Sequence, residues 1–276
     1  MNLSPQAFSL RRGEPIIYEN KLTLYPILMS HYEDFLSCKD AITLRQSSLP
    51  AKFCGMDYLS ALFATDISSI QNSKDYAGLF LSALRFLYLS LRIEADIEEI
   101  KKNVICINKN GEWKVESICV SQNNNTIYIT PREFSAKIRP IIAAQNGLNC
   151  AEESETTTLI QDYESKNNFS LKEVSLKFNT QDLIASVAYL SHLREYEIYD
   201  WTIAEFERRR RAIERDKRYT LYNTAELSGM VKFKNGNPAT SWCFDTVDNE
   251  AGTKSLSEIG QTFGEKKKNK KIKNKK

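Results

Sequence analysis

The sequence predicts an α+β fold that is mainly α-helical. Apolar residues recur at helical spacing in several long stretches, whereas three short runs between residues 104 and 130 are β-prone and separated by turn residues. A hydrophobic share of 42% over 276 residues is enough for one large core or two smaller ones. We therefore expect an N-terminal helical domain with a small β-hairpin and a β-meander, then a C-terminal helical domain and a disordered lysine-rich tail.

The N-terminal elements begin with the hairpin. Residues 15–18 and 22–25 are short β-prone runs on either side of a polar turn. Residues 30–45 then carry apolar residues at helical spacing, which predicts a helix. Two further helices are expected at residues 57–63 and 76–93. The second is apolar on most faces, so we place it at the centre of its domain.

The middle of the chain changes to a β-prone pattern. Residues 104–108, 113–120 and 126–130 are rich in β-branched and aromatic residues, and Asn and Gly residues separate them. This arrangement predicts a three-stranded antiparallel meander.

A helix is expected directly after the meander. Thr130 is the predicted N-cap, Pro131 occupies the first helical position, and Glu133 has the spacing of a capping box. Pro140 should kink or shorten this helix, because proline lacks the backbone N–H. The helix should end near residues 145–147.

The C-terminal half predicts two further helices. One spans residues 180–193, and the other begins at Thr202, where Glu205 repeats the capping-box spacing. Gly229 suits a helix end in the left-handed conformation. An exposed, strand-like segment should follow it.

Changes in composition predict the domain boundaries. Residues 151–169 are polar and acidic at their start, which indicates a linker or an exposed helix, and the end of the chain becomes polar and lysine-rich. The expected parts are an α+β domain (1–150), the acidic linker or helix (151–169), a helical domain (170–248) and a disordered tail (249–276).

The net charge of +3 depends on the C-terminal run from Lys266 to Lys276, which holds eight lysines and no acid. Without that run the charge of the chain is about −5, so we expect the folded part not to be a basic nucleic-acid binder. The run itself is able to hold phosphates and equally suits a solubilising end. A weak nucleic-acid interaction through it stays open.

Compartment signals predict a soluble intracellular protein. The six cysteines include no CxxC pair, and no secretory apolar region follows Met1. The most apolar stretch, residues 79–91, is too short to span a bilayer, so we expect no membrane interaction.

Reaction chemistry is hard to find in the sequence. The two histidines, His31 and His192, lie far from any cysteine at ligand spacing, and GxSxG, HExxH and phosphate-loop patterns are absent. Carboxylates cluster at residues 94–99 and 152–155, where a charged outer helix face is the simplest interpretation. We therefore expect no catalytic residue, no cofactor, no metal site and no enzymatic activity.

Four consecutive arginines, Arg208 to Arg211, are the sharpest charge feature. Four adjacent helical positions point around most of the circumference and so cannot form one groove-reading face. Glu205, Glu207 and Glu214 lie three or four residues from several of these arginines. The pattern favours an ion-paired helix surface, from which one or two arginines could bind an acidic partner.

Three segments of the chain form a recognisable set. They are Ile129-Thr-Pro-Arg-Glu-Phe-Ser-Ala-Lys-Ile-Arg-Pro-Ile-Ile-Ala-Ala-Gln-Asn-Gly, Trp201-Thr-Ile-Ala-Glu-Phe, and Glu226-Leu-Ser-Gly-Met-Val-Lys-Phe-Lys followed by Trp242. Together they resemble tail assembly chaperones and related tail proteins of tailed bacteriophages that infect Gram-positive hosts. The opening Gly13-Glu-Pro-Ile-Ile-Tyr is similar as well. Most of residues 13–244 are covered by the resemblance. The chain departs from the pattern at Ser241, where relatives have His, at Pro140, and in its lysine run.

The resemblance implies a role in tail morphogenesis in the host cytoplasm, with the tape measure protein as the partner. The alternative is a permanent component of the virion, such as a tail or baseplate subunit, and an oligomer is compatible with either role. A partner of this kind needs adaptable apolar contacts rather than catalytic geometry. The candidate partner-binding residues are Trp201, Phe206, Tyr219, Met230, Phe233 and Trp242.

Overall fold

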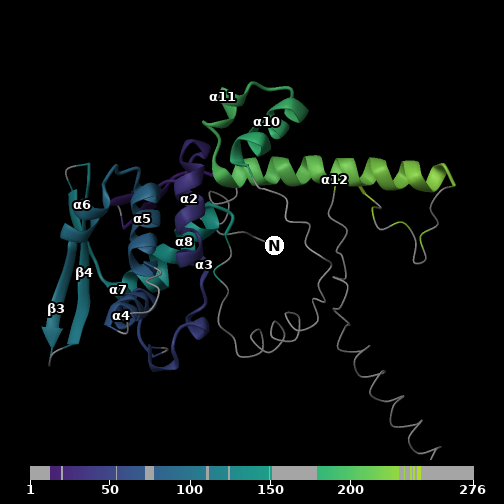
Figure 1. The fold of residues 1–276 in the computed structure, drawn as a ribbon. Helices are drawn as coiled ribbons and strands as arrows, with labels where there is room; N and C mark the ends of the chain where they lie inside the picture. The colour runs from purple at the N-terminus through teal and green to yellow at the C-terminus, as the bar shows by residue number, and fades with distance from the viewer. Residues whose placement is uncertain are drawn as a thin grey trace, which may run out of the picture. The chain divides into compact units, whose positions relative to one another are not determined.

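The computed structural model of the chain confirms the mainly helical α+β fold class (Figure 1). It describes residues 13–19, 21–53, 55–71, 78–109, 112–123, 125–148, 150, 179–229, 233, 237, 239 and 241–243. The predicted linker (151–169), the tail from residue 249 onward and Met230 lie outside the described residues.

The chain divides into two compact units. Unit 1 consists of Met1–Ser154 and Lys177–Arg210, and unit 2 consists of Glu155–Leu176 and Arg211–Lys276. The first part of the expected C-terminal domain therefore groups with the N-terminal part of the chain. Its apolar residues, Ile184, Val187 and Ile198 among them, are buried.

Short and medium-length helices form most of unit 1. In chain order they are η1 (Met29–His31), α2 (Tyr32–Cys38), α3 (Asp40–Thr43), η2 (Gln46–Ser48), η3 (Ala51–Phe53), α4 (Tyr58–Gln71), α5 (Leu79–Leu91), α6 (Ile97–Lys102), α7 (Pro131–Glu133), η4 (Phe134–Ile138), α8 (Arg139–Gln145), α10 (Thr180–Ser191) and α11 (Glu195–Ile198). The long helix α12 (Ile203–Leu227) begins in unit 1 and continues into unit 2.

Two small antiparallel sheets confirm the predicted hairpin and meander. The strands are β1 (Ile16–Tyr18) and β2 (Leu22–Leu24) in the first sheet, and β3 (Val104–Lys109), β4 (Glu112–Gln122) and β5 (Asn125–Ile129), in that order, in the second. A bulge interrupts the pairing of β3 with β4, because Ile105 faces Ser117 while Cys106 faces Val115. The extra residue shifts the alternation of β4, so that Val115 and Ile118, three residues apart, are both buried.

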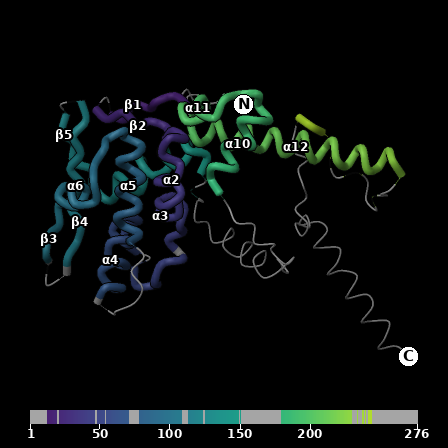
Figure 2. The backbone as a smooth tube through the Cα atoms, turned by 45° about the horizontal axis from the view of Figure 1, so that its top comes forward, coloured from purple at the N-terminus to yellow at the C-terminus, as the bar shows by residue number. Residues whose placement is uncertain are grey.

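Helix α5 forms the centre of unit 1, as its apolar sequence predicts. Leu84, Phe86 and Leu87 on this helix are completely buried. The helix contacts α2, α3, α4, α6 and β2. Figures 1 and 2 both show it between the three-stranded sheet and α2.

Three buried side-chain amides fasten the first hairpin to the rest of unit 1. Gln122 accepts a hydrogen bond from the Thr23 N–H and donates one to the Thr23 carbonyl. Gln145 donates to the Leu24 carbonyl at 3.0 Å, and Asn146 accepts from the Ile27 N–H at 2.8 Å. The amides thus satisfy backbone groups that would otherwise be buried without partners.

The helix after the meander is continuous but changes its hydrogen-bonding pattern. Thr130 caps it, as predicted, by accepting from the Glu133 N–H at 3.2 Å. The predicted return bond of a capping box is wrong, since the Glu133 carboxylate accepts from the Tyr18 hydroxyl instead. The π-helical turn η4 lies directly before Pro140. Such a turn shifts the hydrogen-bond register ahead of a residue that lacks an N–H, so the helix passes Pro140 without ending.

A short backbone pairing joins α12 to the N-terminal segment of unit 1. Leu28 and Thr202 form an antiparallel bridge, and the Met29 N–H donates to the Trp201 carbonyl at 2.8 Å. The Ser30 N–H donates to the Tyr199 carbonyl at 3.1 Å. The helix predicted for residues 30–45 is three short pieces (η1, α2 and α3) instead of one, and α2 gives way to α3 at Lys39.

Other helix predictions differ mainly in length. The helix predicted at residues 57–63 extends to Gln71, whereas α6 and α11 are additional short helices. Asp96 and Glu99 form a complete capping box at α6. Gly229 has φ +71°, which confirms the predicted left-handed helix end.

Candidate partner-binding surfaces

Two groups of exposed apolar or aromatic side chains lie on α10, α11 and α12. The first is Tyr189, Tyr196 and Tyr199, which we call the tyrosine surface. The second is Leu221 and Leu227, which we call the leucine face. Large exposed side chains of this kind are candidates for protein contacts, because tyrosine and other bulky residues supply much of the contact area at interfaces.

Buried residues on its other side hold α10 in place. Asn179 caps its N-terminus by accepting from the Gln181 N–H at 3.0 Å. Ile184, Val187 and Ala188 are buried, whereas Tyr189 lies beside this stripe and is 79% exposed. The ring of Tyr189 is thus presented by a helix that is fixed by its core-facing residues.

Helix α11 presents the other two tyrosines in a similar way. The backbone N–H of Arg194 donates to the Glu197 carboxylate at 2.8 Å, which caps this short helix. Ile198 is completely buried, and the carbonyl of Tyr199 is bonded to the Ser30 N–H. Tyr196 and Tyr199 are exposed on either side of Ile198. Figures 1 and 2 show α10 and α11 next to one another near the start of α12.

Arginines lie against aromatic rings in this part of unit 1. The guanidinium of Arg194 is 5.9 Å from the centre of the Tyr196 ring and donates to its hydroxyl at 3.4 Å. The guanidinium of Arg209 is 4.2 Å from the centre of the Trp201 ring. Both are cation–π contacts, so the aromatic side chains of this region are in positions that cations can reach.

The leucine face lies on the part of α12 that belongs to unit 2. Leu221 is 64% exposed and Leu227 is 89% exposed. Leu221 and Leu227 are six residues apart, so on an α-helix their side chains point about 120° apart, and Thr224 lies between them. Leu227 also continues a seven-residue spacing with Phe206, Ile213 and Thr220.

Another side of α12 is covered within unit 2. The ring of Tyr222 packs against that of Phe233, with 5.5 Å between the ring centres. Asn237 donates to Asn223 at 3.2 Å and to Glu226 at 2.9 Å. Phe233 and Asn237 therefore contact the side of α12 that carries Tyr222 and Asn223, whereas Leu221 and Leu227 are exposed.

Of the six predicted partner-binding residues, the five that the structure describes do not all lie on the surface. Trp201 is half-buried beneath Arg209, and Phe206 is completely buried beside Tyr32, with 6.0 Å between the ring centres. Because Phe206 has no accessible side-chain area, it is a core residue in this structure. Its helical spacing from Ile203, which is also buried, already indicated a core-facing position.

The other predicted residues belong to unit 2 or fall outside the described residues. Tyr219 is half-buried on α12, Phe233 packs on Tyr222, and Trp242 is exposed. Met230 is outside the described residues. The tyrosines at 189, 196 and 199 and the two leucines were missed by sequence reasoning, although Tyr196 and Tyr199 alternate with acidic residues in a way that is typical of an exposed segment.

Ion pairs within α12 involve Arg209 and Arg210 of the arginine run. Arg209 lies 3.7 Å from the Glu205 carboxylate, and Arg210 lies 3.0 Å from that of Glu207. This confirms the predicted helix surface at these two arginines. Each pair is partly exposed, so its contribution to stability is about 0.3–0.5 kcal/mol.

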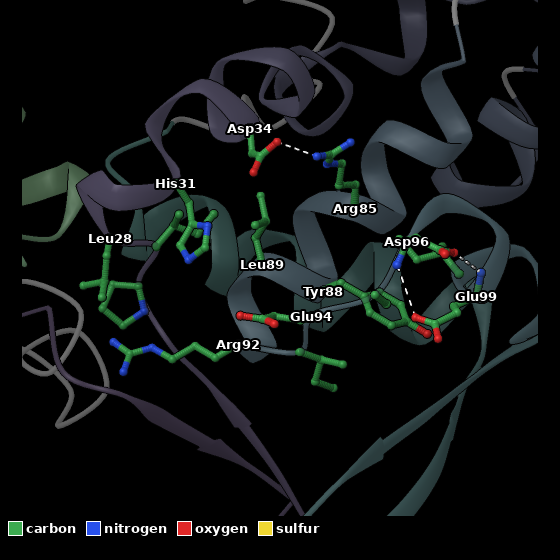
Figure 3. A pocket seen from close by; sticks show the side chains of 15 residues that line it. Leu28, His31, Asp34, Arg85, Tyr88, Leu89, Arg92, Glu94, Asp96 and Glu99 are labelled. Carbon is green, nitrogen blue, oxygen red and sulfur yellow. Dashed lines mark hydrogen bonds and ion pairs between the residues drawn. The ribbon is translucent and has the colours of Figure 1, made fainter. Parts of the chain in front are cut away.

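A cavity of about 570 Å³ lies between the C-terminal end of α5, the start of α6 and the N-terminal segment of unit 1 (Figure 3). Its fifteen lining residues are Pro26, Ile27, Leu28, His31, Asp34, Arg85, Tyr88, Leu89, Arg92, Ile93, Glu94, Ala95, Asp96, Glu99 and Ile100. Serine, threonine and cysteine do not occur among them. His31 therefore has no serine, threonine or cysteine beside it among the residues that line this cavity.

Most of the charged groups in the cavity are already bonded. Asp34 forms an ion pair with Arg85, and Asp96 and Glu99 bond to each other's backbone N–H at the start of α6 (Figure 3). Burial raises the pKa of the Tyr88 hydroxyl, which accepts a hydrogen bond from Asn103. The polar groups of the cavity thus hold its walls together.

Within the described parts of the chain, no group of His, Cys, Asp and Glu side chains has an arrangement that could hold a metal ion. The same residues include no helix that is both long and apolar enough to cross a membrane. Burial raises the pKa of the Cys38 thiol to about 12, and it also raises the pKa values of Cys106 and Cys150. Thiols with raised pKa values are poor nucleophiles near neutral pH.

Comparison of the chain with protein-family models, with curated proteins and with solved structures found no match.

Proposed function

We propose that this chain is an assembly chaperone of tailed bacteriophages that binds the tape measure protein during tail morphogenesis in the host cytoplasm. The observation that carries the proposal is the leucine face of α12. The sequence resemblance supplies the identity of the client, and the exposed leucines supply a surface that suits such a client.

The leucine face suits a helical client. Leu221 and Leu227, both largely exposed, would each gain about 1.5–3 kcal/mol on full burial, and a client helix that packs over Thr224 would contact both of them. The client that the resemblance implies is long and rich in amphipathic helices. Contact with α12 would cover apolar residues of the client before the tail tube polymerises around it.

Co-expression of the full chain with the candidate tape measure protein tests the proposal. We expect the chain to raise the soluble fraction of the tape measure protein and to copurify with it. Replacing Leu221→Glu and Leu227→Glu together should abolish both effects, because charged side chains oppose burial against an apolar client.

Ile70→Glu is the matched control, because Ile70 is also a helical residue with an exposed apolar side chain, at 60%, and lies on α4 in unit 1. The control variant should retain full chaperone activity. Equal activity of the double leucine variant and the native chain would contradict the proposal.

Mass spectrometry of purified virions separates this role from that of a permanent tail or baseplate subunit. A chaperone should be missing from mature particles or far below the copy number of tail proteins. A stoichiometric amount in the particle would favour the structural component instead.

A further inference from the structure

We infer that the tyrosine surface of α10 and α11 is a docking site for a lysine- or arginine-rich polypeptide segment. This site is in unit 1 and is separate from the leucine face, so it does not depend on the identity of the client proposed above. Three observations carry the inference: the exposure of the rings, their fixed presentation and the charge that surrounds them.

The rings are exposed although their helices are firmly held. Tyr189 and Tyr196 stand outside the buried stripe formed by Ile184, Val187 and Ile198. The backbone of α11 is further fixed by the bond from the Ser30 N–H to the Tyr199 carbonyl. Because the backbone of these helices is held, and a tyrosine side chain has only two rotatable bonds to order, little conformational entropy is lost when a partner binds.

The charge around the rings is negative. Residues 179–210, which include the start of α12 beside Trp201, contain six acids and four arginines, so the acidic groups are in excess by two. Asp182, Glu195 and Asp200 are exposed, whereas Glu197 is engaged in the cap of α11. An excess of carboxylates beside tyrosine rings repels nucleic acids and acidic proteins and attracts cationic side chains.

Two arginines of the chain already make cation–π contacts with aromatic rings in this region. Arg194 lies over one face of Tyr196, and Arg209 lies over the nearby Trp201. Among the described residues, Tyr189 and Tyr199 carry no such cation. A basic segment would place its lysine or arginine side chains over these rings and pair with the exposed carboxylates.

Fluorescence anisotropy with a labelled dodecamer of lysine tests the inference on the full chain. The peptide should bind at low salt, and its affinity should fall as salt is raised, while a glutamate dodecamer should not bind. The double variant Tyr189→Ser and Tyr199→Ser should weaken lysine-peptide binding about 5- to 30-fold, since each of the two cation–π contacts contributes about 0.5–1 kcal/mol at an exposed site.

Tyr128→Ser is the matched control, because Tyr128 is an exposed tyrosine on β5, away from α10 and α11. For the charges, Asp200→Asn should weaken binding, whereas Asp40→Asn on α3 should not. Thermal unfolding of each variant checks that the fold is intact, and exposed positions should tolerate these changes.

Absence of binding to the native chain, or equal weakening by the control variants, would overturn the inference, because it would leave only the diffuse attraction of an acidic protein for a polycation. The chain's own run from Lys266 to Lys276 has the same chemistry as the probe. Tighter peptide binding by a chain that ends at residue 265 would support the site and identify this run as a competing occupant.

Discussion

The side-chain amide of Gln122 pairs with the backbone of Thr23 as a neighbouring strand would. Its oxygen accepts from the Thr23 N–H at 2.7 Å, and its nitrogen donates to the Thr23 carbonyl at 3.0 Å. The same nitrogen donates to the Leu91 carbonyl at the end of α5. One side chain at the end of β4 therefore links the hairpin, the sheet and the central helix.

Gln122→Ala should lower the free energy of unfolding by about 1–3 kcal/mol, because it leaves buried backbone groups of Thr23 and Leu91 without partners. Urea unfolding measures the change, which should appear in the midpoint rather than in the slope. Ser121→Ala on the same strand is the control and should change stability by less than about 0.5 kcal/mol. An equal loss of stability in both variants would contradict a specific contribution of the Gln122 amide to the free energy of unfolding.

Phe206→Ala should destabilise unit 1 by about 3–5 kcal/mol, since the ring is completely buried against Tyr32 and its removal leaves a cavity. Leu221→Ala on the same helix should cost far less, because that side chain is exposed. Thermal or urea unfolding of the two variants provides the comparison. Equal losses would show that Phe206 is not part of the core.

Tyr18→Phe should make stability less dependent on pH in alkaline solution. Burial, with the hydrogen bond to Glu133 as the next cause, raises the pKa of Tyr18 to about 12. A raised pKa means that the neutral phenol favours the folded state, so its contribution is present below about pH 10 and is lost as the pH rises toward 12.

Urea unfolding at several alkaline pH values measures this dependence. The native chain should lose stability over this range more steeply than the Tyr18→Phe variant. Tyr128→Phe, at an exposed position of β5, should follow the native curve. A Tyr18→Phe curve that runs parallel to that of the native chain would count against a raised pKa.

Cys38 should react slowly with a disulfide reagent such as Ellman's reagent near pH 8, because its thiol is buried and its pKa is raised to about 12. Cys243 is exposed and should react in the fast phase. Cys243→Ser should therefore remove one fast-reacting thiol, whereas Cys38→Ser should leave the fast phase unchanged. A fast phase that diminishes in Cys38→Ser would show that this thiol is accessible.

Local sequence signals located the elements with strong periodicity or clear caps. The hairpin, the meander, the Thr130 cap, the central helix and the left-handed Gly229 all depend on residues that are close together in the chain. Contacts with residues far away in the chain decided which hydrogen bonds the side chains of these elements make. Glu133 had the spacing to close a capping box, yet it bonds to Tyr18, which is 115 residues away.

The candidate surfaces were harder to predict than the fold. An aromatic residue on an amphipathic helix can face the core or the solvent, and only the packing of its neighbours decides which. Phe206 proved to be buried, whereas Tyr189 and Tyr196 proved to be exposed. Their role in binding a partner stays a prediction, as does that of Trp201 and Trp242.

The sequence by itself determined the mainly helical α+β class and most of the helix and strand positions, because backbone propensity, apolar periodicity and capping act over a few residues. The tertiary structure decided which side chains bond at the ends of the helices. It also decided how α10 and α11 pack in unit 1 and which aromatic side chains stay exposed. These depend on pairs such as Gln122 with Thr23 and Leu28 with Thr202, whose partners are brought together only when the chain has folded.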